Sequence, residues 1–392
     1  MDSSSPFLYV GCQVGAERAL KAEVQQEWSE FRPAFSKPGF VTFKAPPQLR
    51  GIAELDLRSA FARCSGESLG SVQGEGPEGL AERFWQQVGD QKFQQLHVWC
   101  SARPANFKGG TDADEHDPLL SVVAALQQKC PAGLSPGETS KLAGTPDESS
   151  TPPVAASGHP FGINAVAQTG QGVLSCIIVD RTRWWIGFHK AGSLPSRWPG
   201  GVYPVRLPEH AVSRAYAKMA EALAWSRMPV VSGDLCAELG CAPGGSCQLL
   251  LERRLRVLGI DPAEMDPGVL RLPGFRHIRK RGREVKKREF REVRWLLADS
   301  NVAPTHTLDT VQDIVTHRDA NIRGLLLTLK LTTWGHATSL PEFLARIRSW
   351  GYRYVKARQL AHGGQEVCVF ALRRQGLLRL GGQARRKGLQ QR

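Results

Sequence analysis

The chain has 392 residues, of which 41% are hydrophobic and 22% charged, the composition of a globular protein with two or three domains. It holds no run of 18 uncharged apolar residues, which argues against a transmembrane helix. Its first residues lack a basic stretch followed by an apolar core, so we predict no signal peptide and a cytoplasmic protein without a membrane partner. The nine cysteines are scattered and form no CxxC pair. We therefore expect reduced, mostly buried thiols and no metal site.

The net charge of +14 is concentrated in two short stretches. From Arg271 to Arg294 there are eleven Lys or Arg against three Glu, and from Arg373 to Arg392 there are seven Lys or Arg and no acid. The rest of the chain is close to neutral. Such focused charge suits a polyanion, above all a nucleic acid. An exposed helix face and a disordered tail would give the same pattern.

The first half of the chain mixes strand-like and helix-like patterns. We expect strands over 7–12, 39–44, 61–64, 69–72, 96–100, 172–180 and 184–189, and helices over 16–28 and 80–88. Residues 131–158 are rich in Pro, Gly, Ser and Thr and predict a disordered insertion. The pair Trp184 and Trp185 is expected in packing, and His189 is expected to be a hydrogen-bonded structural residue. We therefore predict an α+β region over 1–195, which ends at a Pro- and Gly-marked linker.

The second half alternates strands and helices. Helices are expected over 213–225, 242–255, 284–293 and 340–350, and strands over 234–240, 256–261, 275–280, 295–300, 324–331, 352–359 and 366–374. This alternation is typical of a parallel or mixed sheet with helices on both faces. The prediction is a Rossmann-like α/β domain over 200–380, followed by a basic tail over 381–392.

A Gly-rich turn joins the first strand of this domain to a helix. In AELGCAPGGSCQLLL, residues 237–251, Gly240 permits a tight turn, and Gly244 and Gly245 let the backbone approach a ligand. Asp261 ends the next strand, where an acid can accept hydrogen bonds from ribose hydroxyls. The loop has neither GxGxxG spacing nor a GK[ST] ending, so dinucleotide and P-loop interpretations are weak.

The pattern [D/E]-x-G-x-x-P-G-G resembles the S-adenosylmethionine loop of the FtsJ-like RNA ribose methyltransferases, with Glu238 where Asp is usual. The resemblance implies S-adenosyl-L-methionine as the cofactor. It also implies a binding set made of Ser213, Glu238, Gly240, Ala242, Pro243, Gly244, Gly245, Asp261 and Asp299.

That family uses a Lys-Asp-Lys-Glu tetrad, and each of its positions is filled here. SRAYAK supplies Lys218, LLADS supplies Asp299, LLLTLK supplies Lys330, and the last strand supplies Glu366. We hypothesise that Lys330 is the base that deprotonates a ribose 2′-hydroxyl, with its pKa lowered by burial or by the neighbouring cation Lys218. Asp299 would orient Lys330, and Glu366 would position Lys218 or the ribose.

Other methyltransferase types fit the sequence less well. Amino-group enzymes tend to place an Asn/Asp-Pro-Pro-aromatic motif after the fourth strand, where this chain reads Asp299-Ser-Asn-Val. Pyrimidine C5 enzymes need a cysteine near that strand, and none occurs between Cys247 and Cys368. A ribose hydroxyl is therefore the favoured acceptor.

Segments outside the catalytic domain resemble the RlmM-type enzymes. They include YVGCQVGAERALKAE, PAFSKPGFVTFK, WWIGFHKA and SRWPGGVYPVRLPEHAVSRAYAK. The resemblance implies methylation of a cytidine 2′-hydroxyl in 23S ribosomal RNA and an N-terminal THUMP-type RNA-binding region. RNA is then the expected partner, DNA is not, and the protein is expected to be a monomer. Two alternatives stay open, namely a 2′-O-methyltransferase of another RNA and an inactive RNA-binding homologue.

One position departs from the family pattern. After the third strand the family has Gly-Asp near the adenine, whereas Gly282 is followed here by Arg283. This leaves the adenine contact open. The surrounding Lys and Arg residues form either an additional RNA-contact surface or an exposed helix face.

Overall fold

The computed structural model describes residues 6–102, 118–131 and 161–389, with side chains up to residue 383. The chain divides into two compact units, residues 1–204 and 205–392, which are described one at a time. No helix in the described parts of the chain is long and apolar enough to cross a membrane. All nine cysteines are free, and seven of them are buried, as the prediction of mostly buried thiols requires.

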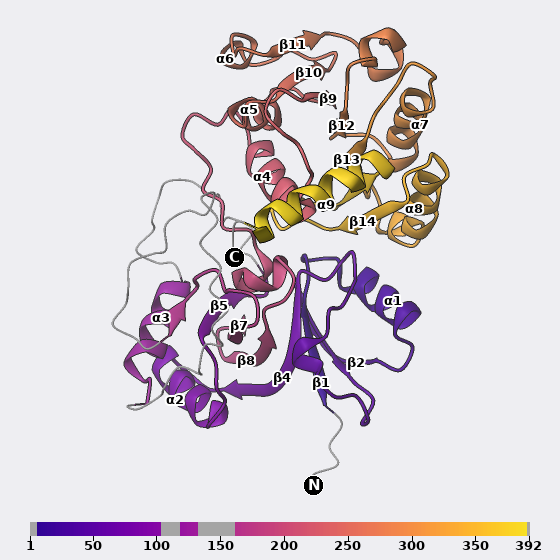
Figure 1. The fold of residues 1–392 in the computed structure, drawn as a ribbon. Helices are drawn as coiled ribbons and strands as arrows, with labels where there is room; N and C mark the ends of the chain where they lie inside the picture. Colours follow the sequence, from indigo (N-terminus) through magenta and orange to yellow (C-terminus); the bar gives the residue numbers. More distant parts are fainter. Residues whose placement is uncertain (1–5, 103–117, 132–160, 390–392) are drawn as a thin grey trace. The chain divides into compact units, whose positions relative to one another are not determined.

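The first unit is built on an eight-stranded sheet in the order β2-β3-β1-β4-β8-β7-β5-β6 (Figure 1). Its strands are β1 (Phe7–Gly11), β2 (Arg32–Lys37), β3 (Phe40–Lys44), β4 (Cys64–Gln73), β5 (Gln95–Cys100), β6 (Gly162–Ile163), β7 (Gly172–Asp180) and β8 (Arg183–Lys190). Only β5 pairs in parallel, with β6 and β7. The weak strand expected at 69–72 lies within a long strand, β4, but of the strand expected at 61–64 only Cys64 belongs to it. Strand β4 continues through Gly70, where the register with β8 shifts.

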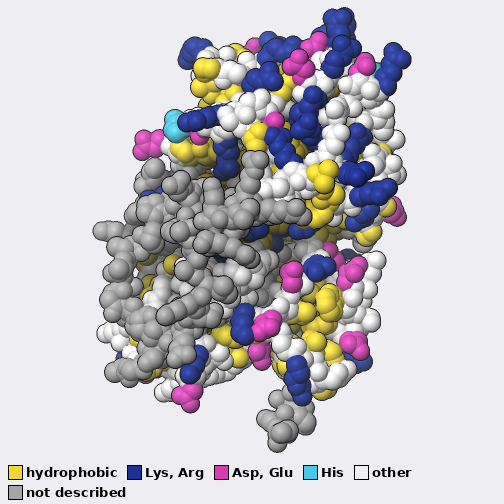
Figure 2. Space-filling model, viewed as in Figure 1, with side chains coloured by type: hydrophobic (Ala, Val, Ile, Leu, Met, Phe, Trp, Pro, Cys, Tyr) yellow, Lys and Arg dark blue, Asp and Glu magenta, His cyan; other side chains and the backbone are white. Residues whose placement is uncertain are grey.

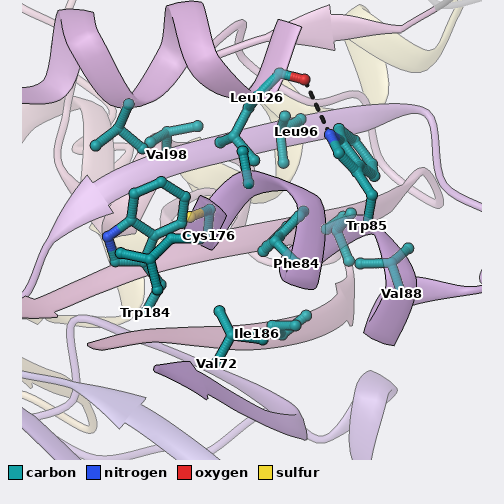
Figure 3. Packing of buried hydrophobic residues seen from close by; sticks show 14 of the residues in the cluster. Val72, Phe84, Trp85, Val88, Leu96, Val98, Leu126, Cys176, Trp184 and Ile186 are labelled. Atoms are coloured by element: carbon teal, nitrogen blue, oxygen red, sulfur yellow. Dashed lines mark hydrogen bonds between the residues drawn. The ribbon is translucent and has the colours of Figure 1, made fainter. Parts of the chain in front are cut away.

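Helices α2 (Pro77–Val88) and α3 (Pro118–Gln128) cover the β5, β7 and β8 part of this sheet, while α1 (Glu17–Glu27) packs near β1 and β2 (Figure 1). Phe84 and Leu126 are 0% exposed and Trp184 is 2% exposed, so aromatic and aliphatic side chains fill the space between helices and sheet (Figure 3). The indole Nε1 of Trp85 donates to the carbonyl of Leu126 at 2.9 Å and joins the two helices. This cluster is the main core of the unit.

The aromatic pair on β8 has a packing role, as predicted. Trp184 points into the core, whereas the half-buried Trp185 faces the opposite side of the sheet, with its ring centroid 4.7 Å from that of Phe35. His189 is buried and satisfied, because Nδ1 contacts the Tyr9 hydroxyl at 3.1 Å and Nε2 contacts the Ser196 carbonyl at 2.7 Å. The predicted insertion 131–158 lies, apart from its first residue, outside the described residues.

The second unit has a seven-stranded sheet in the order β11-β10-β9-β12-β13-β15-β14. Its strands are β9 (Leu235–Leu239), β10 (Arg256–Ile260), β11 (Phe275–Ile278), β12 (Trp295–Ala298), β13 (Gly324–Lys330), β14 (Tyr354–Arg358) and β15 (Glu366–Leu372). All run parallel except β15, which is antiparallel to both of its neighbours. Helices α4 (Ala215–Ser226) and α5 (Gly245–Glu252) lie on one face, and α7 (Pro304–Val315) and α8 (Leu340–Ser349) lie on the other (Figure 1). The predicted α/β architecture is confirmed.

The prediction of a basic helix over 284–293 is wrong. Two short 3-10 helices stand there instead, Gly282–Glu284 and Lys287–Phe290, separated by extended residues. The extended backbone of Val285 and Lys286 interrupts any continuous helix, and the side chains of Val285, Phe290 and Val293 are buried in the domain. Burying these three side chains therefore determines the path of the segment.

Lys and Arg side chains are nevertheless spread over the visible face of this unit (Figure 2). Several cations of the 271–294 stretch face acids: Arg276 faces Glu289 at 2.9 Å, Arg279 faces Glu264 at 3.2 Å, Arg283 faces Asp309 at 3.5 Å, and Lys287 faces Asp313. These exposed pairs neutralise part of the local charge but contribute little stability each.

Three helices of the second unit were not foreseen from the sequence, and neither was α3 of the first unit. In α7, Leu308, Val311 and Val315 have helical spacing behind Pro304, a residue that suits the first turn. A short helix α6 (Pro267–Leu270) begins with Asp266 as its N-cap. Helix α9 (Arg374–Leu389) includes the beginning of the segment expected as a basic tail from residue 381.

Because Phe84 is completely buried in the core of the first unit, Phe84→Ala should lower the free energy of unfolding by about 3–5 kcal/mol, through lost burial and the cavity left behind. Urea unfolding followed by tryptophan fluorescence measures the change. Phe7→Ala is the matched control, since Phe7 is 38% exposed and its loss should cost less than about 1 kcal/mol. Equal losses in both variants would contradict this description of the core.

Candidate active site

The strand order of the second unit brings four charged residues to one edge of the sheet. Asp299 directly follows β12, and Lys330 is the last residue of β13. Glu366 is the first residue of β15, and because β15 is antiparallel its beginning lies at the same edge, where Lys330 pairs with Glu366 in register. Lys218 reaches this edge from α4. All four residues of the predicted tetrad are therefore assembled.

These four side chains form a closed ring of alternating charge. Lys218 Nζ contacts Asp299 Oδ2 closely and lies 3.1 Å from Glu366 Oε1. Lys330 Nζ contacts Glu366 Oε2 closely and lies 3.2 Å from Asp299 Oδ1. Each carboxylate thus bridges both ammonium groups. Their side chains are 7–23% exposed, so water screens these contacts less than it would at the surface.

The electrostatics of Lys330 differ from the prediction. Partial burial lowers its pKa, but the carboxylates of Asp299 and Glu366 outweigh that effect, so the pKa is raised above the ordinary lysine value. The expected lowering by burial or by Lys218 is therefore wrong for the protein without ligands. The separate roles predicted for Asp299 and Glu366 are not seen either, because each of these carboxylates contacts both Lys218 and Lys330.

The Gly-rich loop follows β9, next to the point where the strand order reverses between β9 and β12. Such a reversal opens a crevice at the carboxyl ends of the strands. Gly240 and Gly244 have φ values of +75° and +118°, in the left-handed region that favours glycine. A Cβ on Gly245 would lie 2.3 Å from Ser213 Oγ and 2.8 Å from the Ser213 carbonyl oxygen. The loop backbone is thus packed against Ser213.

Glu238 lies behind this loop with no exposed surface. Its carboxylate accepts hydrogen bonds from the Ser246 hydroxyl and, at 3.0 Å, from the Cys247 thiol, both in the first turn of α5. Burial raises the pKa of Glu238 to about 7, although these two hydrogen bonds oppose the rise. In this structure Glu238 holds the loop against α5.

Asp261 sits beyond the end of β10 and is also tied to the loop. Its two carboxylate oxygens accept from the backbone N–H groups of Ala242 at 3.1 Å and Ala263 at 2.8 Å. Arg283, the departure from the family pattern, directs its guanidinium to Thr310 and Asp309 on α7. A side chain in place of Gly282 would also meet Thr310, with its Cβ at 2.9 Å.

Comparisons with known proteins agree with this arrangement. The FtsJ-like methyltransferase family matches residues 211–334, a range that holds the loop and three of the four ring residues. Residues 211–334 therefore hold an FtsJ-like methyltransferase domain.

The chain's relatives include the ribosomal RNA large subunit methyltransferase M of Halorhodospira halophila, 26% identical over 92% of this chain and 95% of that protein. The protein of the same description in Aromatoleum aromaticum is 30% identical over 50% of this chain and 54% of its own length. Among solved structures, TrmN from Thermus thermophilus aligns over 94% of this chain and 99% of its own, with 14% identity and a TM-score of 0.32.

The loop of this FtsJ-like domain fits S-adenosylmethionine in one further respect. The Ser213 hydroxyl is buried, and among the described residues it has no hydrogen-bond partner. An orphaned buried hydroxyl is costly unless a ligand or water satisfies it. It lies directly beside Gly245 of the loop.

The FtsJ-like domain has site residues that the sequence did not indicate. A small cavity beside the ring is lined by Glu238 and Ser246 together with apolar and weakly polar side chains, including Met219, Leu326, Thr328, Leu360 and Cys368. Met219 follows Lys218 directly. Thr328 is two positions before Lys330, and Cys368 is two positions after Glu366. Such spacing is a weak signal, because it also describes ordinary core residues.

Stability should depend on pH through Glu238. Its raised folded-state pKa means that the folded chain holds the proton between about pH 4.5 and pH 7 while the unfolded chain releases it, so its contribution falls as pH rises through that window. Relative to Glu238→Gln, the wild type should lose about 3 kcal/mol of unfolding free energy across the window. Urea unfolding at several pH values measures it, and parallel pH dependences of the two proteins would refute it.

Proposed function

We propose that this protein transfers the methyl group of S-adenosylmethionine to a ribose 2′-hydroxyl of ribosomal RNA, a cytidine of 23S RNA in particular. The observation that carries the proposal is the closed ring of Lys218, Asp299, Lys330 and Glu366 beside the Gly-rich loop. The names of the relatives support ribosomal RNA as the substrate class.

A ribose hydroxyl is a weak nucleophile, so its proton must leave during the reaction. When bound, S-adenosylmethionine supplies a methyl group that its sulfonium activates for attack. Lys330 Nζ is the group that takes the hydroxyl proton. Because Asp299 and Glu366 hold Lys330 protonated in the free protein, Lys330 must first give up a proton. Lys218, which contacts the same carboxylates, keeps them paired when the ribose replaces their contacts with Lys330.

The cofactor contacts belong to the loop and its neighbours. Gly240, Ala242, Pro243, Gly244 and Gly245 provide backbone that can closely approach the methionine and ribose parts. Ser213 and Asp261 offer side-chain oxygens, and Glu238 supports the loop from behind. Asp299, in both the ring and the binding set, links the cofactor site to the base.

The first unit is proposed as the RNA-binding region, with a THUMP-like part, that presents the substrate. Similarity to the large subunit methyltransferase M of Halorhodospira halophila extends over 92% of the chain and so includes this unit. A 2′-O-methyltransferase of another RNA remains the second candidate. An inactive homologue is disfavoured because the ring is complete.

Lys330→Ala should lower methyl transfer by about 100- to 10,000-fold, the usual contribution of a general base, while S-adenosylmethionine still binds. Transfer of labelled methyl to unmodified ribosomal RNA, followed by nucleoside analysis, should give 2′-O-methylcytidine with the wild type. Lys356→Ala, a change on β14 outside the ring, should retain wild-type turnover. Undiminished turnover of the Lys330 variant would refute its role as base, and a modified nucleoside other than 2′-O-methylcytidine would change the substrate.

Gly245→Ala should weaken S-adenosylmethionine binding at least about tenfold, equivalent to about 1.4 kcal/mol, because the new Cβ must displace Ser213. Isothermal titration calorimetry measures the dissociation constant. Gly192→Ala is the control, since nothing lies within 4 Å of its added Cβ. Unchanged affinity in the Gly245 variant would mean that this loop does not form the cofactor site.

A further inference from the structure

A further buried glutamate, Glu221, stands one turn from Lys218 on the same helix. Glu221 in α4 is 0% exposed. Its Oε1 accepts from the backbone N–H of Ala361 and its Oε2 from that of His362, both at 2.8 Å. A buried carboxylate is costly unless such donors compensate it, so the contact holds the helix and the backbone at 361–362 together.

The backbone that Glu221 holds belongs to the turn between β14 and β15, which leads directly into Glu366. The turn is tight: the Glu366 N–H donates to the Gly364 carbonyl at 2.8 Å, and a Cβ on Gly363 would lie 2.9 Å from Glu366 Oε1. At its far end, the Leu331 N–H donates to the Gln365 carbonyl at 2.9 Å. A shift of this turn would therefore move the Glu366 carboxylate.

We propose that Glu221 is a positioning residue for methyl transfer, which ties the helix carrying Lys218 to the turn carrying Glu366. It thereby sets the Lys218–Glu366 side of the ring, where the two charged groups are 3.1 Å apart. Residues three apart on a helix lie on neighbouring positions of one face, so a single helical turn presents both the ring lysine and its support. This inference rests on the proposed role of the ring.

The direct test is Glu221→Gln in the full chain. The carboxamide oxygen can accept one of the two N–H groups, but its NH₂ group faces the other donor, so the turn should be released. Amide hydrogen exchange at Ala361 and His362, measured by NMR or by peptide mass spectrometry, should become at least about tenfold faster. Unchanged protection of both amides would overturn the proposal.

In Glu221→Gln, displacement of the Glu366 carboxylate should change the kinetics in a way that a general loss of stability would not. The turnover number should fall about 10- to 100-fold, with little change in the Michaelis constant for S-adenosylmethionine. The groups that face Lys330 are Asp299 from β12 and Glu366 from β15, with Lys218 from α4 across the ring. Losing part of the Glu366 contact should lower the Lys330 pKa, so the acidic limb of the rate profile should move to lower pH.

Three further variants sharpen the result. Glu366→Gln should move the acidic limb in the same direction, and Glu221→Asp should restore part of the turnover lost in Glu221→Gln. Glu23→Gln is the matched control, because the Glu23 carboxylate also accepts two backbone N–H groups, those of Ala60 and Phe61, but in the first unit. It should cost stability and leave the limb in place.

The outcomes separate this inference from the proposed function. If the wild type methylates RNA and Glu221→Gln does so with the wild-type pH profile, the positioning role is wrong and the ring assignment stands. If Glu23→Gln shifts the limb as much as Glu221→Gln does, the effect is general and the positioning role is also wrong. If the wild type methylates no RNA, the proposed function fails, while the exchange experiment still decides whether Glu221 holds the turn.

Discussion

The candidate active site of the second unit depends on four charges that are brought together out of bulk water. Each carboxylate of the ring has two ammonium partners, and each ammonium group has two carboxylates. Removing one member would leave the partly buried ring with an unbalanced charge, which is more costly than losing a surface pair. The four residues come from α4 and from the ends of β12, β13 and β15, so the ring forms only when helix and sheet are correctly packed.

The same packing places the cofactor loop. The strand order reverses between β9 and β12, and the loop after β9 and Asp299 after β12 therefore flank one crevice. Glu238 holds the loop to α5 from behind, Asp261 holds it from the side, and Glu221 holds the turn before Glu366. Three carboxylates outside the ring thus fix the backbone around it. This explains why several acids near the site bond to the protein's own N–H and O–H groups.

Part of the positive charge that the sequence concentrates at 271–294 is neutralised within the fold. In the 271–294 stretch, cations such as Arg276 and Lys287 face acids of the same unit, and three buried apolar side chains pin the segment to the domain. The stretch is thus an integral part of the fold. Its remaining positive charge still favours a polyanionic partner, in keeping with an RNA substrate.

The sequence by itself determined the α/β pattern, the Gly-rich loop and the identity of the four ring residues. Periodicity reports which residues are buried, and the special backbone of the loop requires glycine at positions such as Gly240. The sequence-based prediction failed over 284–293. The charged residues there suggested a helix, but the segment forms two short 3-10 helices and buries Val285, Phe290 and Val293. The prediction also missed Glu221, because nothing local distinguishes that residue from an ordinary helix glutamate.

Only the tertiary structure decided that Lys330 has a raised pKa and that each carboxylate serves both lysines. These properties depend on distances between residues up to 148 positions apart, from Lys218 to Glu366. The sign of the Lys330 shift results from two carboxylates outweighing partial burial. Such a balance exists only once α4, β12, β13 and β15 have packed together.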